Sequence, residues 1–379
     1  MPAIHFPELT PIATRATEEK PDDAFQLVIV QYDRRPVTFP ESSLHDNKRA
    51  MTLVSTPDNL IPDGAVTGMI QTPDGVTLRF ARWGSPPDGK RVAKGDAKGT
   101  VCVFTGRSEF IEKYFETVRD LRQRGFAVAV VDWRGQGHSS RQLPDPRKGH
   151  VASFREFEID VETFMRLVVL PDCPPPYQAL AHSMGGAVML RAAHCGRRWF
   201  ERMVLAAPLI DLPHGRASWP VRILMRALRL VGFGNSYVPG SNVDRARASG
   251  FPGNPLTTDP GRYARNAALI EQDPTLGIGS PTVAWLDEAF DSMVEFGAAD
   301  YPSLIVAPVL MVAAGADRIV SGAAIAQFAA RLPSGSHLVI EGARHEILQE
   351  SDLYRAQFWA AFDGFVPGKA PGAMPGGSI

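Results

Sequence analysis

Long apolar runs and an excess of basic charge are both missing from this sequence of 379 residues. No stretch reaches the ~20 apolar residues that a membrane-spanning helix needs, and the first 20 residues lack the basic and apolar regions of a secretory signal. The formal net charge is only -1, so no general positive field attracts nucleic acid. We therefore expect a cytoplasmic protein that binds no nucleic acid, and that can lie against the inner face of the cell membrane.

Cysteine is scarce, with Cys102, Cys173 and Cys195 as the only examples. An odd and widely spaced set does not form a disulfide framework, and no CxxC pair suggests a metal site. The simplest interpretation is three small neutral side chains in a reducing compartment. We predict neither a metal nor an organic cofactor.

Short apolar runs alternate with amphipathic segments over most of the chain. The predicted strands are 75–83, which alternates like an exposed strand, and 100–106, 126–133, 177–183, 203–209, 308–315 and 337–343. The predicted helices are 111–125, 154–169, 185–194 and 323–331. Continuous apolar strands alternating with helices indicate an α/β fold, with a mostly parallel sheet covered by helices on both faces.

This alternation stops between residues 209 and 301, where Pro, Gly, Asn and Arg are scattered through helical and loop-like sequence. Connections in such sheets are short, so we predict an inserted helical cap there, dividing the core into 61–208 and 302–366. Residues 1–60 form an N-terminal extension whose order the pattern does not indicate, with a strand-like run at 25–32. The Gly- and Pro-rich end, 367–379, is predicted to be a disordered tail.

The segment LAHSMGG at 180–186 joins a predicted strand directly to a predicted helix. This is the setting of a nucleophile elbow, a strained turn that exposes the hydroxyl of its serine at the edge of the sheet. Gly185 and Gly186 supply the small residues that the turn needs on one side, and Ala181 stands where the usual motif has glycine. We predict that Ser183 is the nucleophile. The alternative is a serine that merely caps the following helix.

A serine nucleophile needs a base and an acid. In this fold both follow the serine along the chain, first the acid and then the histidine. Asp317 and His345 each come just after a predicted strand, in GADRIV and GARHEI. They are the predicted acid and base, although either alone fits an ordinary loop residue. Asp211, after the preceding strand, is a rival acid. His182 is a poorer base because it points the other way along its strand.

The predicted oxyanion hole consists of two backbone N–H groups. One belongs to Met184, at the start of the helix, and the other to Arg107, where Gly106 lets the backbone approach closely. The alternative for the second is a simple glycine turn. The loop DWRGQGHS at 132–139 lacks a full phosphate-binding fingerprint, and we interpret it as a structural support of this edge.

Several segments together resemble the bacterial lysophospholipase and monoacylglycerol lipase group of serine α/β-hydrolases, which are similar to serine aminopeptidase S33. They are TGRSEFIEKY, VDWRGQGHS, LAHSMGG, NPLTTDPGRYARN, GADRIV and GARHEILQE, within residues 65 to 365. The resemblance implies hydrolysis of lipid monoesters, with Ser183 as nucleophile, Asp317 as acid, His345 as base, and Arg107 and Met184 as oxyanion donors. Ala181 and Thr105 depart from the family pattern. A peptidase or amidase, and an inactive binding protein of the same fold, are the alternatives.

Residues 219–232 read as an amphipathic helix with three arginines on one side. Its basic stripe suits contact with anionic lipid, and we hypothesise that the helix helps to admit the acyl chain. The alternative is a surface helix whose apolar face packs on the cap or the core. The apolar positions are Val221, Leu224, Met225, Leu228 and Val231, and the basic ones are Arg222, Arg226 and Arg229.

Overall fold

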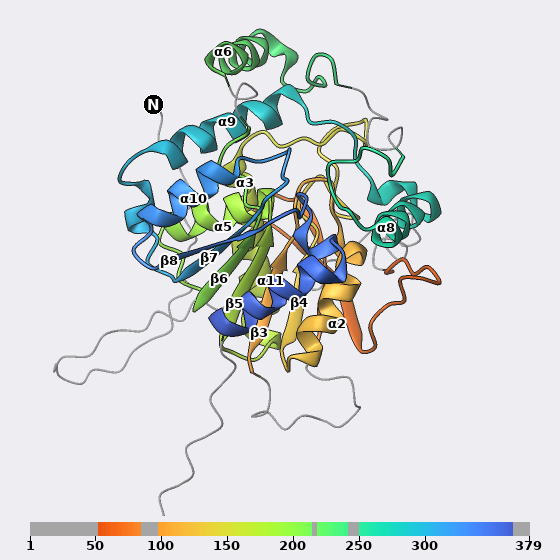
Figure 1. Cartoon of the computed structure of the whole chain (residues 1–379). Helices are drawn as coiled ribbons and strands as arrows, with labels where there is room; N and C mark the ends of the chain where they lie inside the picture. The colour runs from red at the N-terminus through yellow and green to blue at the C-terminus, as the bar shows by residue number, and fades with distance from the viewer. Residues whose placement is uncertain (1–51, 85–97, 214–217, 242–249, 367–379) are drawn as a thin grey trace, which may run out of the picture. The chain divides into compact units, whose positions relative to one another are not determined.

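A computed structural model describes residues 52–84, 98–213, 218–241 and 250–366 (Figure 1). The predicted strand at 25–32, most of the N-terminal extension and the tail at 367–379 lie outside these residues. Within the described part of the chain, no helix has both the length and the apolar character required to cross a bilayer.

Eight strands of the described chain form one sheet in the order β1-β2-β4-β3-β5-β6-β7-β8. β1 pairs with β2, and β2 with β4, in antiparallel fashion, and every other pair is parallel, which confirms the predicted mostly parallel sheet. The strands are β1 (Ala65–Gln71), β2 (Thr77–Trp83), β3 (Thr100–Phe104), β4 (Ala127–Val131), β5 (Tyr177–His182), β6 (Arg202–Ala206), β7 (Val309–Ala314) and β8 (Gly335–Ile340).

Helices cover both faces of this sheet, because its central strands are apolar on both sides. Figure 1 shows α2 and α11 in front of the strands and α3 and α5 behind them. The helices of the core are η2 (Ile111–Tyr114), α2 (Phe115–Gln123), α3 (Phe154–Phe164), η3 (Met165–Val169), α4 (Leu170–Asp172), α5 (Met184–His194), α10 (Gly322–Arg331), η7 (Ile347–Gln349) and α11 (Asp352–Phe365).

The first two strands differ from expectation. β1 was not predicted, because its residues are mostly half-buried and Gly68 interrupts its apolar pattern. β2 was predicted to be exposed, which is wrong: Leu78, Ala81 and Trp83 are buried. The reason is that these side chains pack into the hydrophobic core, where the Trp83 ring meets Phe115 of α2 edge to face.

Between β6 and β7 the chain forms α6 (Trp219–Leu228), η4 (Arg229–Phe233), α8 (Pro260–Gln272), η5 (Pro274–Leu276), α9 (Val283–Gly297) and η6 (Tyr301–Leu304). The division of this segment from the core as a separate cap, with bounds at 209 and 301, stays a prediction. α8 is tied to the core, since Arg262 pairs with Glu116 of α2 at 2.6 Å.

Two arginines of this basic segment, Arg226 of α6 and Arg229 of η4, form ion pairs with α9. Arg226 and Arg229 each lie 2.9 Å from a carboxylate oxygen of Asp287 on α9, and Arg229 also pairs with Glu288 at 2.7 Å. These ion pairs were not predicted, because the sequence of α6 alone does not reveal acidic partners some sixty residues away. Contact of these arginines with anionic lipid stays a prediction.

Candidate active site

Ser183 occupies a strained turn between β5, which ends at His182, and α5, which begins at Met184. Its φ of 51° and ψ of -116° are rare for a residue with a side chain. The two glycines that follow are required by contact: a Cβ on Gly185 would lie 2.4 Å from the carbonyl oxygen of Phe104, and one on Gly186 would lie 2.7 Å from Pro208 Cβ. The sequence therefore folds into the elbow geometry, with the buried Ala181 in place of the first glycine.

The structure brings Ser183, His345 and Asp317 together in one hydrogen-bonded chain. Nε2 of His345 lies 3.0 Å from Oγ of Ser183, and Nδ1 of His345 lies 2.7 Å from Oδ2 of Asp317. Asp317 follows β7 and His345 follows β8, so neighbouring parallel strands deliver the two side chains to one edge of the sheet. This arrangement suits transfer of a proton from the serine hydroxyl to the imidazole.

Asp317 is held as a carboxylate. Its other oxygen, Oδ1, accepts the backbone N–H groups of Ile319 at 2.7 Å and Val320 at 3.0 Å. Burial alone would raise the pKa of Asp317, but the hydrogen bond and charge of His345, with those N–H groups, lower it below its ordinary value. The side chain of the rival Asp211 is 41% exposed and lies 3.6 Å from Arg222, whereas the ring nitrogens of His345 contact Asp317 and Ser183.

Hydrogen bonds hold the loop after β3 in place on several sides. Trp133 donates its ring N–H to the carbonyl of Thr105 at 2.8 Å. The side chain of Gln136 donates to the carbonyl of Gly106 and accepts the N–H of Ser108. Trp133 and Gln136 both belong to the DWRGQGHS loop, which therefore supports this edge of the sheet as we interpreted it.

Two backbone N–H groups stay open at this edge. Neither the N–H of Arg107 nor that of Met184 donates to an acceptor within the described part of the chain. Two free donors beside a serine hydroxyl are the arrangement that stabilises an oxyanion. Arg107 and Met184 line the same cavity as Ser183, and their role as oxyanion donors stays a proposal.

A buried group of charged side chains, which sequence reasoning missed, lies against the same edge. In this Glu109 cluster, Oε2 of Glu109 accepts the N–H of Gly106 at 2.5 Å and the hydroxyl of Tyr114 at 2.6 Å, and lies 3.0 Å from Nδ1 of His182. Lys113 bridges Oε1 of Glu109 at 2.8 Å and Glu346 at 2.6 Å. The cluster thereby links the oxyanion loop to the loop that carries His345.

The charges of the Glu109 cluster stabilise one another. Burial alone would raise the pKa of Glu109, but the charges of Lys113 and His182 hold it well below its ordinary value. Burial alone would lower the pKa of His182, but the charge and hydrogen bond of Glu109 raise it above its ordinary value. The nitrogens of His182 contact Glu109 and, at 3.2 Å from Nε2, the carbonyl oxygen of His345, whereas the hydroxyl of Ser183 contacts His345.

The signal for this cluster was weak in the sequence. Glu109 and Lys113 stand four residues apart in TGRSEFIEKY, a spacing equally typical of an exposed helical ion pair. Only the packing of Glu346, from the far end of the chain, reveals that both are buried.

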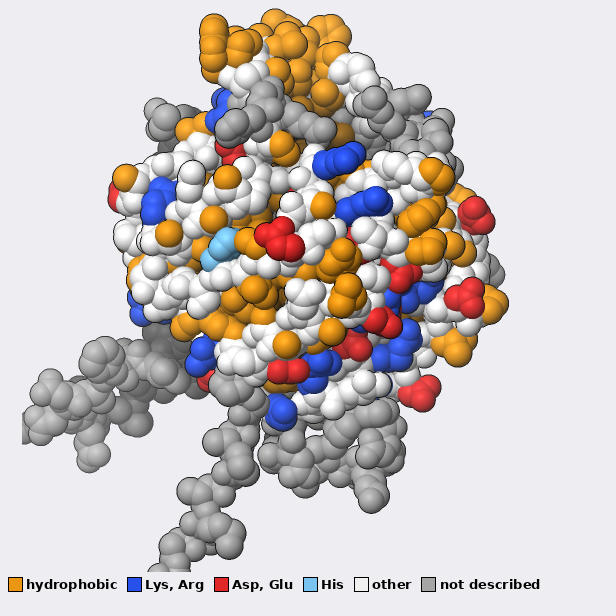
Figure 2. Space-filling model, in the orientation of Figure 1, with side chains coloured by type: hydrophobic (Ala, Val, Ile, Leu, Met, Phe, Trp, Pro, Cys, Tyr) orange, Lys and Arg blue, Asp and Glu red, His pale blue; other side chains and the backbone are white. Residues whose placement is uncertain are grey.

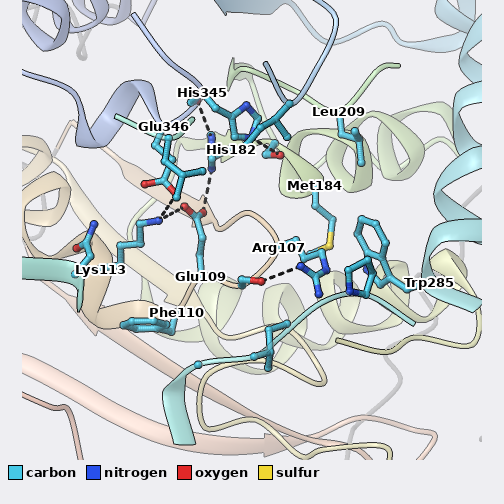
Figure 3. Close-up of a pocket in the computed structure, with 18 of the residues that line it drawn as sticks. Arg107, Glu109, Phe110, Lys113, His182, Met184, Leu209, Trp285, His345 and Glu346 are labelled. Carbon is cyan, nitrogen blue, oxygen red and sulfur yellow. Dashed lines mark hydrogen bonds and ion pairs between the residues drawn. The ribbon is translucent and has the colours of Figure 1, made fainter. Parts of the chain in front are cut away.

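Ser183 opens into a cavity of about 450 Å³, which lies in the size range of small-molecule sites. Figure 3 shows an apolar side with Met184, Leu209 and Trp285, and a polar side with Lys113, Glu109 and Glu346. Within the described residues, no lining residue comes from α6, and no group of His, Cys, Asp and Glu is arranged to hold a metal ion.

Comparison with known proteins identifies a matching family and several proteins of similar sequence. The sequence profile of the family described as serine aminopeptidase, S33, matches residues 95–352. Lysophospholipase L2 of Escherichia coli (strain K12) is 33% identical over 293 residues, covering 75% of this chain and 82% of that protein. Monoglyceride lipase of Mus musculus is 24% identical over 275 residues, covering 70% and 84%.

The fold has solved counterparts. A soluble variant of monoglyceride lipase from Saccharomyces cerevisiae, in complex with a substrate analog, matches with a TM-score of 0.62 and covers 79% of this chain and 96% of its own. At 19% sequence identity, this similarity supports the fold alone.

Proposed function

The chain belongs to the serine aminopeptidase S33 family of hydrolases and has the α/β-hydrolase fold, and from this premise we propose that it is a carboxylic ester hydrolase acting on lipid monoesters. The observation that carries the proposal is the hydrogen-bonded chain of Ser183, His345 and Asp317 at a largely apolar cavity. The relatives named lysophospholipase and monoglyceride lipase support a lipid carrying a single acyl chain.

The proposed reaction begins when Oγ of Ser183 attacks the ester carbonyl carbon while Nε2 of His345 takes the hydroxyl proton. The carbonyl electrons move onto its oxygen, which the N–H groups of Arg107 and Met184 stabilise. As the tetrahedral intermediate collapses, His345 gives its proton to the departing alcohol and an acyl-enzyme forms. Water, deprotonated by the same base, then releases the fatty acid and restores Ser183.

The cavity supports separate places for the two halves of such a substrate. The acyl chain would lie against Leu209, Leu212 and the α9 residues Trp285, Leu286, Ala289 and Met293. α9, rather than α6 as the sequence suggested, therefore contributes the apolar wall. The alcohol would lie toward the polar residues of the lining, which include Arg107, Lys113 and Glu346.

We further propose that the outer side of α6 and η4 rests on the lipid surface that supplies the substrate. Six large apolar side chains there, which we name the apolar crest, are each at least 50% exposed, and Figure 2 shows them as a continuous orange surface above the molecule's other side chains. Arg226 of α6 and Arg229 of η4 are paired with carboxylates of α9, so insertion of the crest would bring no unpaired charge of these two arginines into lipid. The crest consists of Trp219, Ile223, Leu224, Leu230, Val231 and Phe233.

The reaction is tested with purified wild type and Ser183→Ala, each offered lysophospholipids, monoacylglycerols, p-nitrophenyl esters and matched amides, and each labelled with a fluorophosphonate probe. We expect wild type to hydrolyse lipid monoesters faster than amides and to be labelled, and Ser183→Ala to lose both properties. Ser303→Ala, an exposed serine of η6, should behave as wild type.

Other outcomes separate the alternatives. Faster cleavage of amides would replace the ester hydrolase with a peptidase or amidase. A wild type that is neither labelled nor active would indicate a binding protein. Full activity of Ser183→Ala would end the proposed mechanism.

A further inference from the structure

Arg107 is a cation of the cavity that no described carboxylate pairs with. Its side chain lines the cavity and donates from Nη1 to Oγ of Ser108 at 3.0 Å and from Nη2 to the carbonyl of Gly279 at 2.5 Å. Its guanidinium carbon lies 5.3 Å from the ring centre of Trp285. Figure 3 shows it between Met184 and Trp285, across the cavity from His345. All of these partners are neutral.

Three other buried cations of the described chain each pair with carboxylates. Lys113, the other cation of the cavity lining, contacts the two carboxylates of Glu109 and Glu346. Arg79 pairs with Glu112 and Asp132, and Arg134 pairs with three carboxylates. Arg107 has no carboxylate partner among the described residues and lies where a ligand would bind. Arg122 and Arg141 also bond only to carbonyl oxygens, but they do not line this cavity.

The lack of a counter-charge beside Arg107 costs free energy. Nε of Arg107 is buried and has no hydrogen-bond partner, so its loss of hydration is not fully compensated. Burial lowers the pKa of Arg107 to about 10, which still leaves the guanidinium charged at neutral pH. A bound anion would supply the missing counter-charge, and guanidinium groups bind carboxylate and phosphate oxygens especially well.

We infer that the side chain of Arg107 binds the phosphate of a lysophospholipid headgroup and so favours phosphate-bearing monoesters over neutral ones. This inference rests on the proposed function, which places the ester at Ser183. A lysophospholipid carries its phosphate one glycerol unit from that ester, whereas a monoacylglycerol carries a neutral hydroxyl there. Arg107 then contributes twice, with its backbone N–H toward the oxyanion and its guanidinium toward the headgroup.

A purely structural role makes a different prediction. The bond to Gly279 and the contact with Trp285 also tie the oxyanion loop to the segment before α9. If that were the whole function of the side chain, its loss would slow every substrate by the same factor. The relevant quantity is therefore the ratio of kcat/KM for two substrates that differ only in the headgroup.

The first test measures kcat/KM for decanoyl lysophosphatidylglycerol and for 1-decanoylglycerol, both kept below their critical micelle concentrations. Arg107→Gln should lower the lysophospholipid to monoacylglycerol ratio about ten- to a hundredfold, the range for losing a charge-assisted bond. Arg107→Lys should restore part of the ratio. Arg155→Gln, an exposed arginine of α3, makes the same change outside the cavity and should leave the ratio at its wild-type value. An equal loss on both substrates overturns the inference.

The second test does not depend on lipid hydrolysis. In wild type, sn-glycerol 3-phosphate should slow fluorophosphonate labelling of Ser183 more than glycerol or inorganic phosphate does, and Arg107→Gln should abolish that difference. If wild type hydrolyses neither lipid, the proposed function fails, and the labelling result alone decides on Arg107. Equal protection by inorganic phosphate would assign a free-phosphate site instead of a headgroup site, and no protection at millimolar concentrations would overturn the anion site altogether.

Discussion

At the scale of single residues, the role of Asp317 depends on one hydrogen bond. Its 2.7 Å contact fixes which nitrogen of His345 faces Ser183, and its carboxylate would stabilise the imidazolium that forms when the serine proton is taken. Because its pKa lies below the ordinary value, Asp317 stays charged throughout the neutral and mildly acidic range. The amide of asparagine would keep the shape and lose both effects.

We therefore expect Asp317→Asn to lower kcat about a thousand- to ten-thousandfold, with little change in unfolding temperature. The matched control is Asp211→Asn, a change at the rival acid. This variant should retain wild-type kcat, because the side chain of Asp211 contacts Arg222 and the N–H of Leu212 and not His345. Steady-state hydrolysis of a p-nitrophenyl ester measures both variants. A large loss in Asp211→Asn with little loss in Asp317→Asn would reverse the assignment.

Glu109 acts through other groups and so is a positioning residue. It holds the N–H of Gly106 just before the proposed oxyanion donor, and it reaches the His345 loop through Lys113 and His182. Glu109→Gln would replace one accepting oxygen with a donor facing Lys113 or Gly106. Since a misplaced oxyanion loop weakens transition-state binding, we expect kcat to fall about ten- to a hundredfold while KM changes little.

The control for Glu109 is Glu271→Gln at the exposed end of α8, which should leave kcat and KM at wild-type values. Circular dichroism and thermal unfolding report whether Glu109→Gln is folded. A folded variant with wild-type kcat would show that the cluster does not position the loop. An increase in KM alone would assign Glu109 to binding.

At the scale of elements, the sequence predicted the interior of the sheet better than its edges. β3, β4 and β7 are buried along their whole length, so continuous apolar runs identified them. β1 is partly exposed on both faces and leaves no such pattern. The orientation of α6 was unpredictable for a related reason. Its amphipathic character is plain, but the acidic residues of α9 that pair with its arginines lie some sixty residues away in the chain.

The residues of the candidate site also differ in whether the sequence alone could predict them. Ser183, Asp317 and His345 follow from local motifs, because each stands in a turn directly after a strand. The Glu109 cluster does not, since Glu109 and Glu346 come from distant parts of the chain and only the folded structure buries them together.

Glu116 connects three helices and makes their association dependent on pH. It contacts Arg262 and Arg265 of α8 and Arg355 of α11, while it belongs to α2 itself. Burial alone would raise its pKa, but the hydrogen bonds and charges of these arginines lower it to about 2, against 4.5 ordinarily. A depressed folded-state pKa adds stability that is complete above pH 4.5 and is lost as pH falls toward 2.

We therefore expect Glu116→Gln to reduce the free energy of unfolding at pH 7, and to reduce it progressively less as pH is lowered below 4.5. Urea unfolding of wild type and variant at pH 7, 5, 4 and 3.5 measures this difference. Glu271→Gln should show no such convergence, because the exposed Glu271 forms no ion pair with any residue that the structure describes. A difference between wild type and Glu116→Gln that stays constant across this range would contradict the linkage.

At the scale of the whole molecule, the proposed enzyme must take its substrate from a lipid phase into an enclosed cavity. The apolar crest is separate from that cavity, since no residue of α6 or η4 lines it. A change on the crest should therefore alter access to lipid without altering the chemistry at Ser183. Leu230, 79% exposed, is the most exposed of the crest side chains, and each large apolar side chain adds roughly 1.5–3 kcal/mol on full burial.

We expect Leu230→Gln to weaken cosedimentation with phospholipid vesicles about tenfold, and to slow hydrolysis of a monoester presented in those vesicles by a similar factor. Hydrolysis of a soluble short-chain p-nitrophenyl ester should stay at the wild-type rate, because that substrate reaches the cavity through water. Leu353→Gln supplies the matched control: Leu353 of α11 is 70% exposed and lies outside the crest, so this variant should bind vesicles as wild type does. Equal weakening by both substitutions would mean that general surface hydrophobicity, and not the crest, holds the protein on lipid.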